Sequence, residues 1–176
     1  SALNIDGEVE LVTADFCDFR ESLEMINRYG PVEIYNLAAQ SSVGLSFKQP
    51  VDTFQSIING TINLLEVSRY VGYDGRLYFA GSSEIFGNTI EPATTFTTRQ
   101  PLSPYAIAKD ASFNTVQVYR QAFNLKCVTG ILFNHESPYR SSTFVTRKIV
   151  QGALRCAKDP SHRICLGNLN VARDWG

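Results

Sequence analysis

Short apolar and β-branched runs alternate with segments of helical periodicity along this chain, and this alternation limits the fold more than any other feature. The strand-like runs cover residues 9–12, 32–37, 77–80, 127–133 and 163–166, and the helical segments cover 19–29, 50–71, 105–123 and 144–156. Such an order predicts an α/β fold, a doubly wound and mostly parallel sheet with helices on both faces. Ligands of such sheets bind at the carboxyl ends of the strands.

Local signals set the expected ends of these elements. Asp18 is placed to cap the helix that follows it, and Gly30 with Pro31 ends that helix. The helix over 50–71 is expected to bury an apolar stripe made of Phe54, Ile57, Ile58, Ile62, Leu65 and Val67.

Composition narrows the possible partners. The 176 residues carry a net charge of -1 without a basic stripe, which argues against nucleic acid and anionic membranes as partners. No apolar run approaches the roughly 20 residues of a transmembrane helix, and no signal-peptide pattern opens the chain. The four cysteines, Cys17, Cys127, Cys156 and Cys165, are scattered without a C-x-x-C pair. They are expected to be reduced, partly buried thiols of a cytoplasmic protein, with no metal site.

A short segment, residues 103–109, carries the strongest chemical signal. Tyr105 and Lys109 lie one helical turn apart, on one face of a helix whose first turn accommodates Pro104. An ammonium beside a phenol favours the phenolate, so the pair can take a proton from an alcohol while hydride leaves for a nicotinamide. By itself a Tyr-x-x-x-Lys spacing also fits a half-buried tyrosine with a solvated lysine. The hydroxyl pair Ser82 and Ser83, at the end of the strand-like run 77–80, favours the catalytic interpretation.

These features resemble the short-chain dehydrogenases/reductases, and within them the GDP-mannose 4,6-dehydratases. The matching blocks cover nearly the whole chain: residues 33–41, 103–105, 130–138, 144–149, 166–169 and 173–176. The resemblance implies a Rossmann-like domain over 1–133 and the start of a nucleotide-sugar region over 134–176. No glycine-rich turn follows a first strand, so we expect a part of a longer protein that lacks this strand-turn and the C-terminal substrate region.

The resemblance also assigns roles by position. The catalytic residues would be Ser82, Glu84, Tyr105 and Lys109. The cofactor contacts would be Asp15, Phe16, Leu37, Ala38, Ala39, Gln40, Ser41, Lys109, His135 and Arg140. The nucleotide-sugar contacts would be Ser83, Glu84, Asn134, Lys148, Asn168 and Arg173.

Several positions depart from the family pattern, among them Ala106 and Ile107, which replace a small pair and concern packing more than chemistry. Ser82 replaces a threonine, which keeps the hydroxyl but loses the methyl that restricts its rotamer. Tyr139 stands where an arginine is usual, and Asp52 stands where a tyrosine is usual. The implied cofactor is NADP, and these last two departures leave NAD open.

The resemblance implies dehydration of GDP-mannose to GDP-4-keto-6-deoxymannose by a hydro-lyase that forms a homo-oligomer, a dimer or a tetramer. Alternatives are a dehydratase of another GDP-sugar such as a manno-heptose, a nucleotide-sugar epimerase or reductase, or an inactive nucleotide-sugar binding domain. Glu84 favours the dehydratase over the epimerase, because a carboxylate two residues past Ser82 is placed to reach the next carbon of the sugar.

Overall fold

The computed structural model describes residues 7–170 and 172. The chain divides into two compact units, one of residues 11–132 and one that combines residues 7–10 with the described residues from 133 onward. The assignment of a dinucleotide-binding part to 1–133 and a nucleotide-sugar part to 134–176 stays a prediction.

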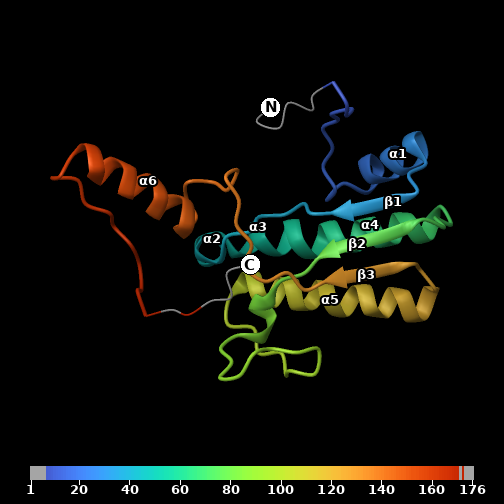
Figure 1. The fold of residues 1–176 in the computed structure, drawn as a ribbon. Helices are drawn as coiled ribbons and strands as arrows, with labels where there is room; N and C mark the ends of the chain where they lie inside the picture. Colours follow the sequence, from blue (N-terminus) through green and yellow to red (C-terminus); the bar gives the residue numbers. More distant parts are fainter. Residues whose placement is uncertain (1–6, 171, 173–176) are drawn as a thin grey trace. The chain divides into compact units, whose positions relative to one another are not determined.

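The first unit is built on a parallel sheet, as the alternating pattern predicted. Its strands are β1 (Glu33–Asn36), β2 (Arg76–Ala80) and β3 (Cys127–Gly130), in the order β1-β2-β3. Asn36 pairs with Phe79, and Phe79 pairs with Thr129. Because all three strands run the same way, their carboxyl ends meet at one edge of the sheet (Figure 1).

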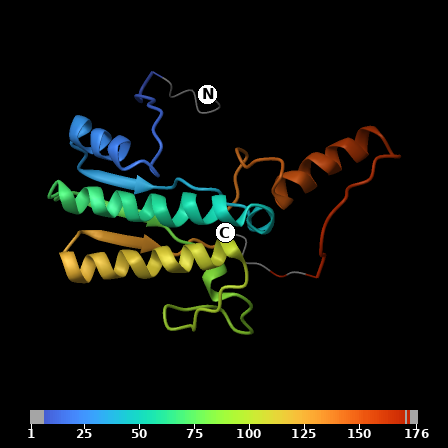
Figure 2. The ribbon, with the colours of Figure 1, turned by 180° about the vertical axis from the view of Figure 1, so that it is seen from behind.

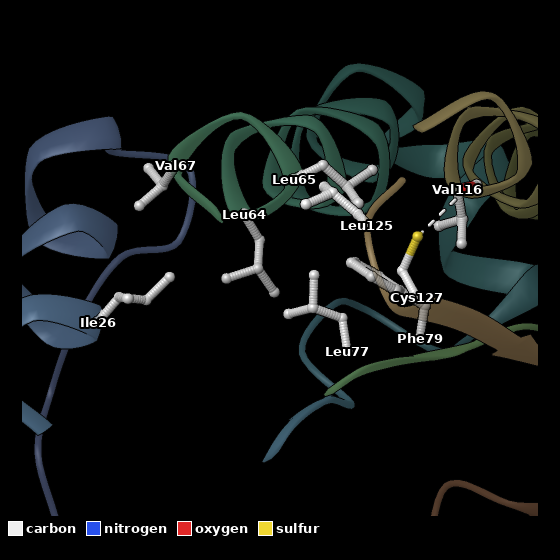
Figure 3. Packing of buried hydrophobic residues seen from close by; sticks show 9 residues of the cluster. All are labelled: Ile26, Leu64, Leu65, Val67, Leu77, Phe79, Val116, Leu125 and Cys127. Atoms are coloured by element: carbon white, nitrogen blue, oxygen red, sulfur yellow. Dashed lines mark hydrogen bonds between the residues drawn. The ribbon is translucent and has the colours of Figure 1, made fainter. Parts of the chain in front are cut away.

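Three helices pack over one face of this sheet: α1 (Phe19–Tyr29), α4 (Gly60–Tyr70) and α5 (Pro104–Phe123). Figures 2 and 3 show α4 and α5 side by side along the strands, with apolar side chains between helices and sheet. This core contains Ile26, Leu64, Leu65, Val67, Leu77, Phe79, Val116, Leu125 and Cys127. Alternate strand residues face it, as expected for a pleated strand with one covered face.

The opposite face of the sheet carries exposed side chains in this unit. Tyr35 is 63% exposed and Val128 is 51% exposed, and the rings of Tyr35 and Tyr78 lie 5.8 Å apart on that face. The sequence pattern predicted helices on both faces of the sheet. Within residues 11–132 the helices cover one face.

The predicted helix ends are confirmed at α1 and α5. The Asp18 side chain accepts hydrogen bonds from the backbone N–H groups of Arg20 and Glu21, and Gly30 ends α1 in the left-handed conformation. Ser103 caps α5 by accepting from the Ala106 N–H at 3.1 Å, and Pro104 occupies the first helical position.

The sequence predicts one continuous helix over 50–71, but the structure divides this segment into three parts. It consists of α3 (Pro50–Phe54), a π-helical turn η1 (Gln55–Asn59) and α4. The Ile57 carbonyl accepts hydrogen bonds from the hydroxyls of Thr61 and Ser112, and such side-chain bonds compete with the regular helical pattern. Of the predicted stripe, Ile57, Leu65 and Val67 are buried, and Leu64 joins them. Phe54, Ile58 and Ile62 are only partly buried.

Two predicted strands are wrong, because residues 9–12 and 163–166 form no strand in the structure. A further helix, α2 (Val43–Lys48), was not predicted. All four cysteines are free thiols, but Cys17 and Cys165 are exposed rather than partly buried. Across residues 7–170 and 172, every helix is too short or too polar to cross a membrane.

The second unit contains one helix, α6 (Val145–Lys158), within its described residues. The segment that follows α6 returns against Gly152, and a Cβ atom at Gly152 would lie 2.6 Å from Ile164 Cγ1. The absence of a side chain at Gly152 therefore permits this close approach.

Candidate active site at the carboxyl edge of the sheet

The exit from β2 holds the predicted hydroxyl and carboxylate residues. A Cβ at Gly81 would lie 2.7 Å from Thr129 Cγ2, so glycine is required where this segment passes β3. Ser82, 8% exposed, caps the 3-10 helix η2 (Ser83–Phe86), and its Oγ accepts from the Glu84 N–H at 3.3 Å. The Ser83 N–H donates to the Leu132 carbonyl at 2.8 Å. These bonds hold Ser82 and Glu84 in a fixed turn of the backbone.

The first two turns of α5 bring Tyr105 and Lys109 to the same edge. Tyr105 is 7% exposed and packs with Ile57 and Ala108. Lys109 Nζ lies 5.8 Å from the centroid of the Tyr105 ring and donates to the Ala80 carbonyl at 2.7 Å. Burial lowers the pKa of Lys109 to about 8, because a poorly hydrated site disfavours the charged form. The lysine is therefore anchored to the end of β2, two residues before Ser82.

The exit from β1 holds five predicted cofactor residues, Leu37, Ala38, Ala39, Gln40 and Ser41. Ala39 has φ of 142°, a conformation that costs energy for any residue with a Cβ. The Gln40 amide is used within the protein, since its oxygen accepts from the Ser42 N–H and its nitrogen donates to Thr53 Oγ1. Small side chains and strained backbone at this position suit the close approach of a flat or pyrophosphate-bearing ligand.

The turn before α1 holds the remaining predicted cofactor residues of this unit, Asp15 and Phe16. The Asp15 carboxylate accepts from the Cys17 N–H at 2.8 Å. Asn63 of α4 donates to the carbonyls of Phe16 and Cys17 and so ties the turn to the helix layer. Sequence reasoning missed Asn63, and no local signal marks it, since its contacts to Phe16 and Cys17 join segments more than 40 residues apart.

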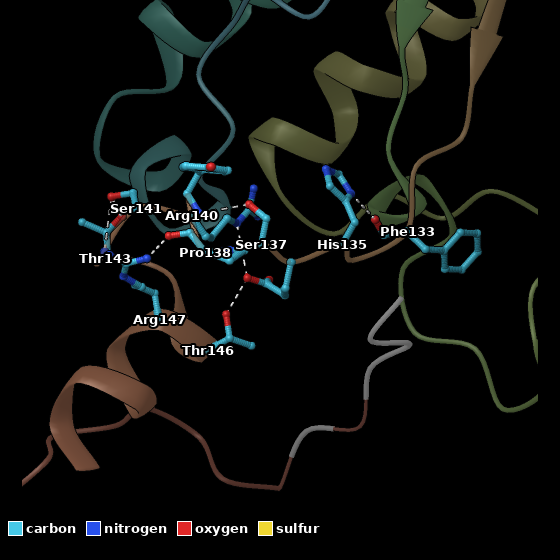
Figure 4. Close-up of polar contacts among 11 residues, drawn as sticks. Phe133, His135, Ser137, Pro138, Arg140, Ser141, Thr143, Thr146 and Arg147 are labelled. Atoms are coloured by element: carbon cyan, nitrogen blue, oxygen red, sulfur yellow. Dashed lines mark hydrogen bonds and ion pairs between the residues drawn. The ribbon is translucent and has the colours of Figure 1, made fainter. Parts of the chain in front are cut away.

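In the second unit, His135 and Arg140 lie in the loop before α6. His135 Nδ1 lies 2.9 Å from the Phe133 carbonyl oxygen (Figure 4). The Arg140 guanidinium stacks on Phe144, 3.6 Å from the ring centroid, and its Nε lies 3.6 Å from a carboxylate oxygen of Glu136. Neighbouring contacts in Figure 4, from Arg147 to the Pro138 carbonyl and between Ser141 and Thr143, order the same loop.

Lys148 lies on α6 beside a basic groove within the second unit. The groove has a volume of about 320 Å³ and is lined by Ser142, Lys148, Gln151, Gly152, Arg155, His162, Arg163, Ile164 and Cys165. Among the described residues of this unit, three cationic side chains and no carboxylate line the groove, which favours an anionic ligand. Of the other predicted sugar-nucleotide residues, Asn134 precedes His135, and the Asn168 side chain accepts from the Asn170 N–H. Arg173 lies outside the described residues.

The structure thus brings Ser82, Glu84, Tyr105 and Lys109 to one edge of the first unit, next to residues 37–41. His135, Arg140, Lys148 and Asn168 belong to the second unit. The roles of all these residues stay predictions. Over the described ranges 7–170 and 172, no group of three His, Cys, Asp or Glu side chains is placed to hold a metal ion.

A parallel sheet with a Tyr-x-x-x-Lys helix at its carboxyl edge defines a Rossmann-like protein of the short-chain dehydrogenase/reductase class. The sequence model of the family described as GDP-mannose 4,6 dehydratase matches residues 1–176. The chain belongs to this family.

Two curated relatives illustrate the similarity. The chain is 42% identical over 172 residues to GDP-mannose 4,6 dehydratase 2 of Arabidopsis thaliana, covering 96% of this chain and 46% of that protein. It is 41% identical over 173 residues to the GDP-mannose 4,6 dehydratase of Drosophila melanogaster, covering 97% and 44% respectively. The chain thus spans about half the length of the curated relatives it matches.

Solved structures support the fold. RMD from Pseudomonas aeruginosa complexed with NADPH superimposes with a TM-score of 0.84 at 24% identity, covering 93% of this chain and 57% of that one. UDP-glucose 4-epimerase from Thermus thermophilus in complex with NAD gives a TM-score of 0.79 at 28% identity, covering 90% and 51%.

Proposed function

We propose that the whole protein to which this chain belongs dehydrates GDP-mannose to GDP-4-keto-6-deoxymannose, with NADP bound as cofactor. The observation that carries the proposal is the anchoring of Lys109 at the end of β2, beside Tyr105 and two residues from Ser82. An alcohol oxidation needs these groups together, and the family is one of dehydratases.

The residues at the first unit's edge suit a dinucleotide. Asp15, Phe16 and residues 37–41 would hold it, because the backbone at Ala39 is strained and the side chains of Ala38, Ala39 and Ser41 are small. The bound cofactor supplies a hydride acceptor for C4 of the sugar and later a hydride donor for C6. NAD is the alternative to NADP, since relatives of this fold are known with either one.

The chain's own residues would move the protons. The Tyr105 phenolate takes the proton of the C4 hydroxyl, and the Ser82 hydroxyl donates a hydrogen bond to that oxygen. The Lys109 ammonium stabilises the phenolate. Once C4 is a ketone, the C5 proton is acidic; the Glu84 carboxylate removes it, and the protonated Glu84 gives a proton to the C6 hydroxyl, which leaves as water. The proton that Tyr105 took from the C4 hydroxyl balances the one that C5 regains when hydride returns to C6.

The basic groove of the second unit would bind the diphosphate of the nucleotide sugar. Lys148, Arg155 and Arg163 supply the positive charge. The assembly of the whole protein as a homo-oligomer, a dimer or a tetramer, is part of the same proposal.

The test uses the full-length protein with GDP-mannose and a catalytic amount of NADP, analysed by mass spectrometry. We expect a sugar nucleotide lighter by one water. A product of unchanged mass that separates from GDP-mannose by chromatography would indicate an epimerase. Intact GDP-mannose, with dehydration of a GDP-manno-heptose in a parallel reaction, would correct the substrate. Intact sugars with tight nucleotide-sugar binding would contradict the proposal in favour of a binding protein.

A further inference from the structure

A small cavity in the first unit is lined in part by Lys109, and most of its other lining residues have no assigned role. Its volume is about 10 Å³, close to the minimum for one water molecule. All three strands contribute to its lining, together with α5 and the π-helical turn. The polar side chains in the lining are Asn36, Thr61, Lys109, Ser112 and Thr129.

Thr129 of β3 is one of the residues that line this cavity. Its Oγ1 is buried and has no hydrogen-bond partner among the described residues. A buried hydroxyl without a partner is costly, since both its donor and its acceptor capacity were satisfied by water before folding. The Thr129 hydroxyl therefore needs a polar partner in the adjoining space.

Lys109 has unused donors at the same cavity. An ammonium group carries three N–H donors, and the described residues provide one acceptor, the Ala80 carbonyl at 2.7 Å. Of the described residues that line the cavity, Lys109 is the one with an ionisable side chain, so no carboxylate among them balances its charge. The remaining donors require neutral acceptors.

The other lining hydroxyls complete a site for one water. Thr61 and Ser112 both donate to the Ile57 carbonyl, at 2.7 and 3.3 Å, and their oxygens keep lone pairs that can accept. A water bound here would have two to four polar partners, which is the number that buried waters usually have.

We propose that this cavity holds one ordered water that joins the Thr129 hydroxyl to the Lys109 ammonium, which makes Thr129 a positioning residue for Lys109. The water accepts a hydrogen bond from the ammonium, and Thr129 orients the water. Lys109 is then held as a cation at its observed place, 5.8 Å from the centre of the Tyr105 ring. Burial lowers the pKa of Lys109 to about 8, so losing one hydrogen-bond acceptor would lower it further.

The first test measures the titration of Lys109 by NMR in the full-length protein labelled with ¹³C at lysine. The Lys109 signal is identified by its loss in Lys109→Arg. Thr129→Val keeps the side-chain shape and removes the hydroxyl, and we expect it to lower the Lys109 pKa by roughly 0.5 to 1 unit. Thr129→Ser keeps the hydroxyl and should restore the original titration.

The control is Thr115→Val. Thr115 lies on α5, its hydroxyl donates to the Ala111 carbonyl at 2.8 Å, and it does not line the cavity. An unchanged Lys109 titration in Thr129→Val would overturn the proposal, and so would an equal shift in Thr115→Val.

The second test needs no variant: a high-resolution crystal structure of the full-length protein should show one water between Thr129 Oγ1 and Lys109 Nζ. A dry cavity there would overturn the proposal. Neither measurement requires turnover, so both outcomes stand whether or not the protein dehydrates GDP-mannose.

Discussion

At the scale of single residues, Lys109 has to satisfy two opposing requirements. Burial lowers its pKa from 10.5 to about 8, which at 1.36 kcal/mol per unit corresponds to about 3 kcal/mol against the charged form. The proposed reaction needs the charged form, because a neutral amine does not stabilise a phenolate. The buried charge of Lys109 therefore lowers the free energy of unfolding at neutral pH, although the same charge supports the chemistry. Such a loss of stability is common at functional sites.

Comparison with Lys109→Met measures how much the buried charge of Lys109 lowers the free energy of unfolding. Between about pH 8 and pH 10.5 the unfolded chain binds more protons at Lys109 than the folded one does, so stability rises with pH in that window. We expect the free energy of unfolding of the unchanged protein to rise relative to Lys109→Met over this range, by up to about 3 kcal/mol. Urea unfolding at several pH values measures the difference. Lys48→Met, at the exposed end of α2, serves as the control and should show no such change. A pH-independent difference for Lys109→Met would contradict the prediction.

Glu84 has a separate test. Glu84→Gln keeps the shape and removes the base, so product formation should fall by roughly 10²- to 10⁴-fold while GDP-mannose binding is nearly unchanged. Mass spectrometry measures the product, and calorimetry measures the binding. Glu91→Gln, in the exposed loop after η2, should leave both unchanged. Parallel loss of binding and turnover in Glu84→Gln would count against its role as a base.

At the scale of elements, the close passage of β2 and β3 fixes where Ser82 lies. Gly81→Ala would place a methyl group 2.7 Å from Thr129 Cγ2 and 2.8 Å from the Gly130 carbonyl oxygen. We expect destabilisation by about 1–3 kcal/mol, because neither neighbour can move without disturbing the sheet. Thermal unfolding tests this against Gly44→Ala, since a Cβ at Gly44 has no atom within 4 Å. Equal stability of the two variants would contradict the steric argument.

The elements also show how far sequence reasoning extends. The parallel sheet, α1, α5 and their caps were predictable, because residues such as Asp18, Ser103 and Pro104 act locally. Residues 9–12 and 163–166 have strand-like composition, but a strand also needs a partner for its backbone groups, and composition does not reveal one. The π-helical turn was not predictable, since one of the hydroxyls bound to the Ile57 carbonyl comes from α5, 55 residues further along the chain.

The candidate site was predictable to a similar extent. The Tyr105–Lys109 spacing and the Ser82 hydroxyl identified the edge of the sheet, where the structure places them. The Ala80 carbonyl as the acceptor for Lys109 and Asn63 as the anchor of the turn at Phe16 depend on tertiary packing. No local pattern in the sequence marks such contacts.

At the scale of the molecule, the net charge of the chain is only -1, but Lys148, Arg155 and Arg163 together make one groove positively charged. We expect Lys148→Met to weaken GDP binding about tenfold at low ionic strength and by less at high salt, because exposed charges are screened. Calorimetry at two salt concentrations measures this. Lys158→Met, in the last turn of the same helix and outside the groove lining, should change GDP affinity little at either one. Equal effects of both variants would show that the groove does not select the diphosphate.

The π-helical turn at Gln55–Asn59 has a consequence for how the length of the chain can change. A π-turn holds one residue more than the same stretch of α-helix, so a deletion of one residue there can be absorbed while α3 and α4 keep their buried faces. An insertion elsewhere in α4 would instead turn Leu64, Leu65 and Val67 by about 100° away from the sheet. The same turn contains the Ile57 carbonyl, which accepts from the Ser112 hydroxyl of α5, so removing the extra residue would shift this acceptor relative to Ser112. The length of this helix is thus coupled, through a single peptide group, to the polar lining beneath Lys109.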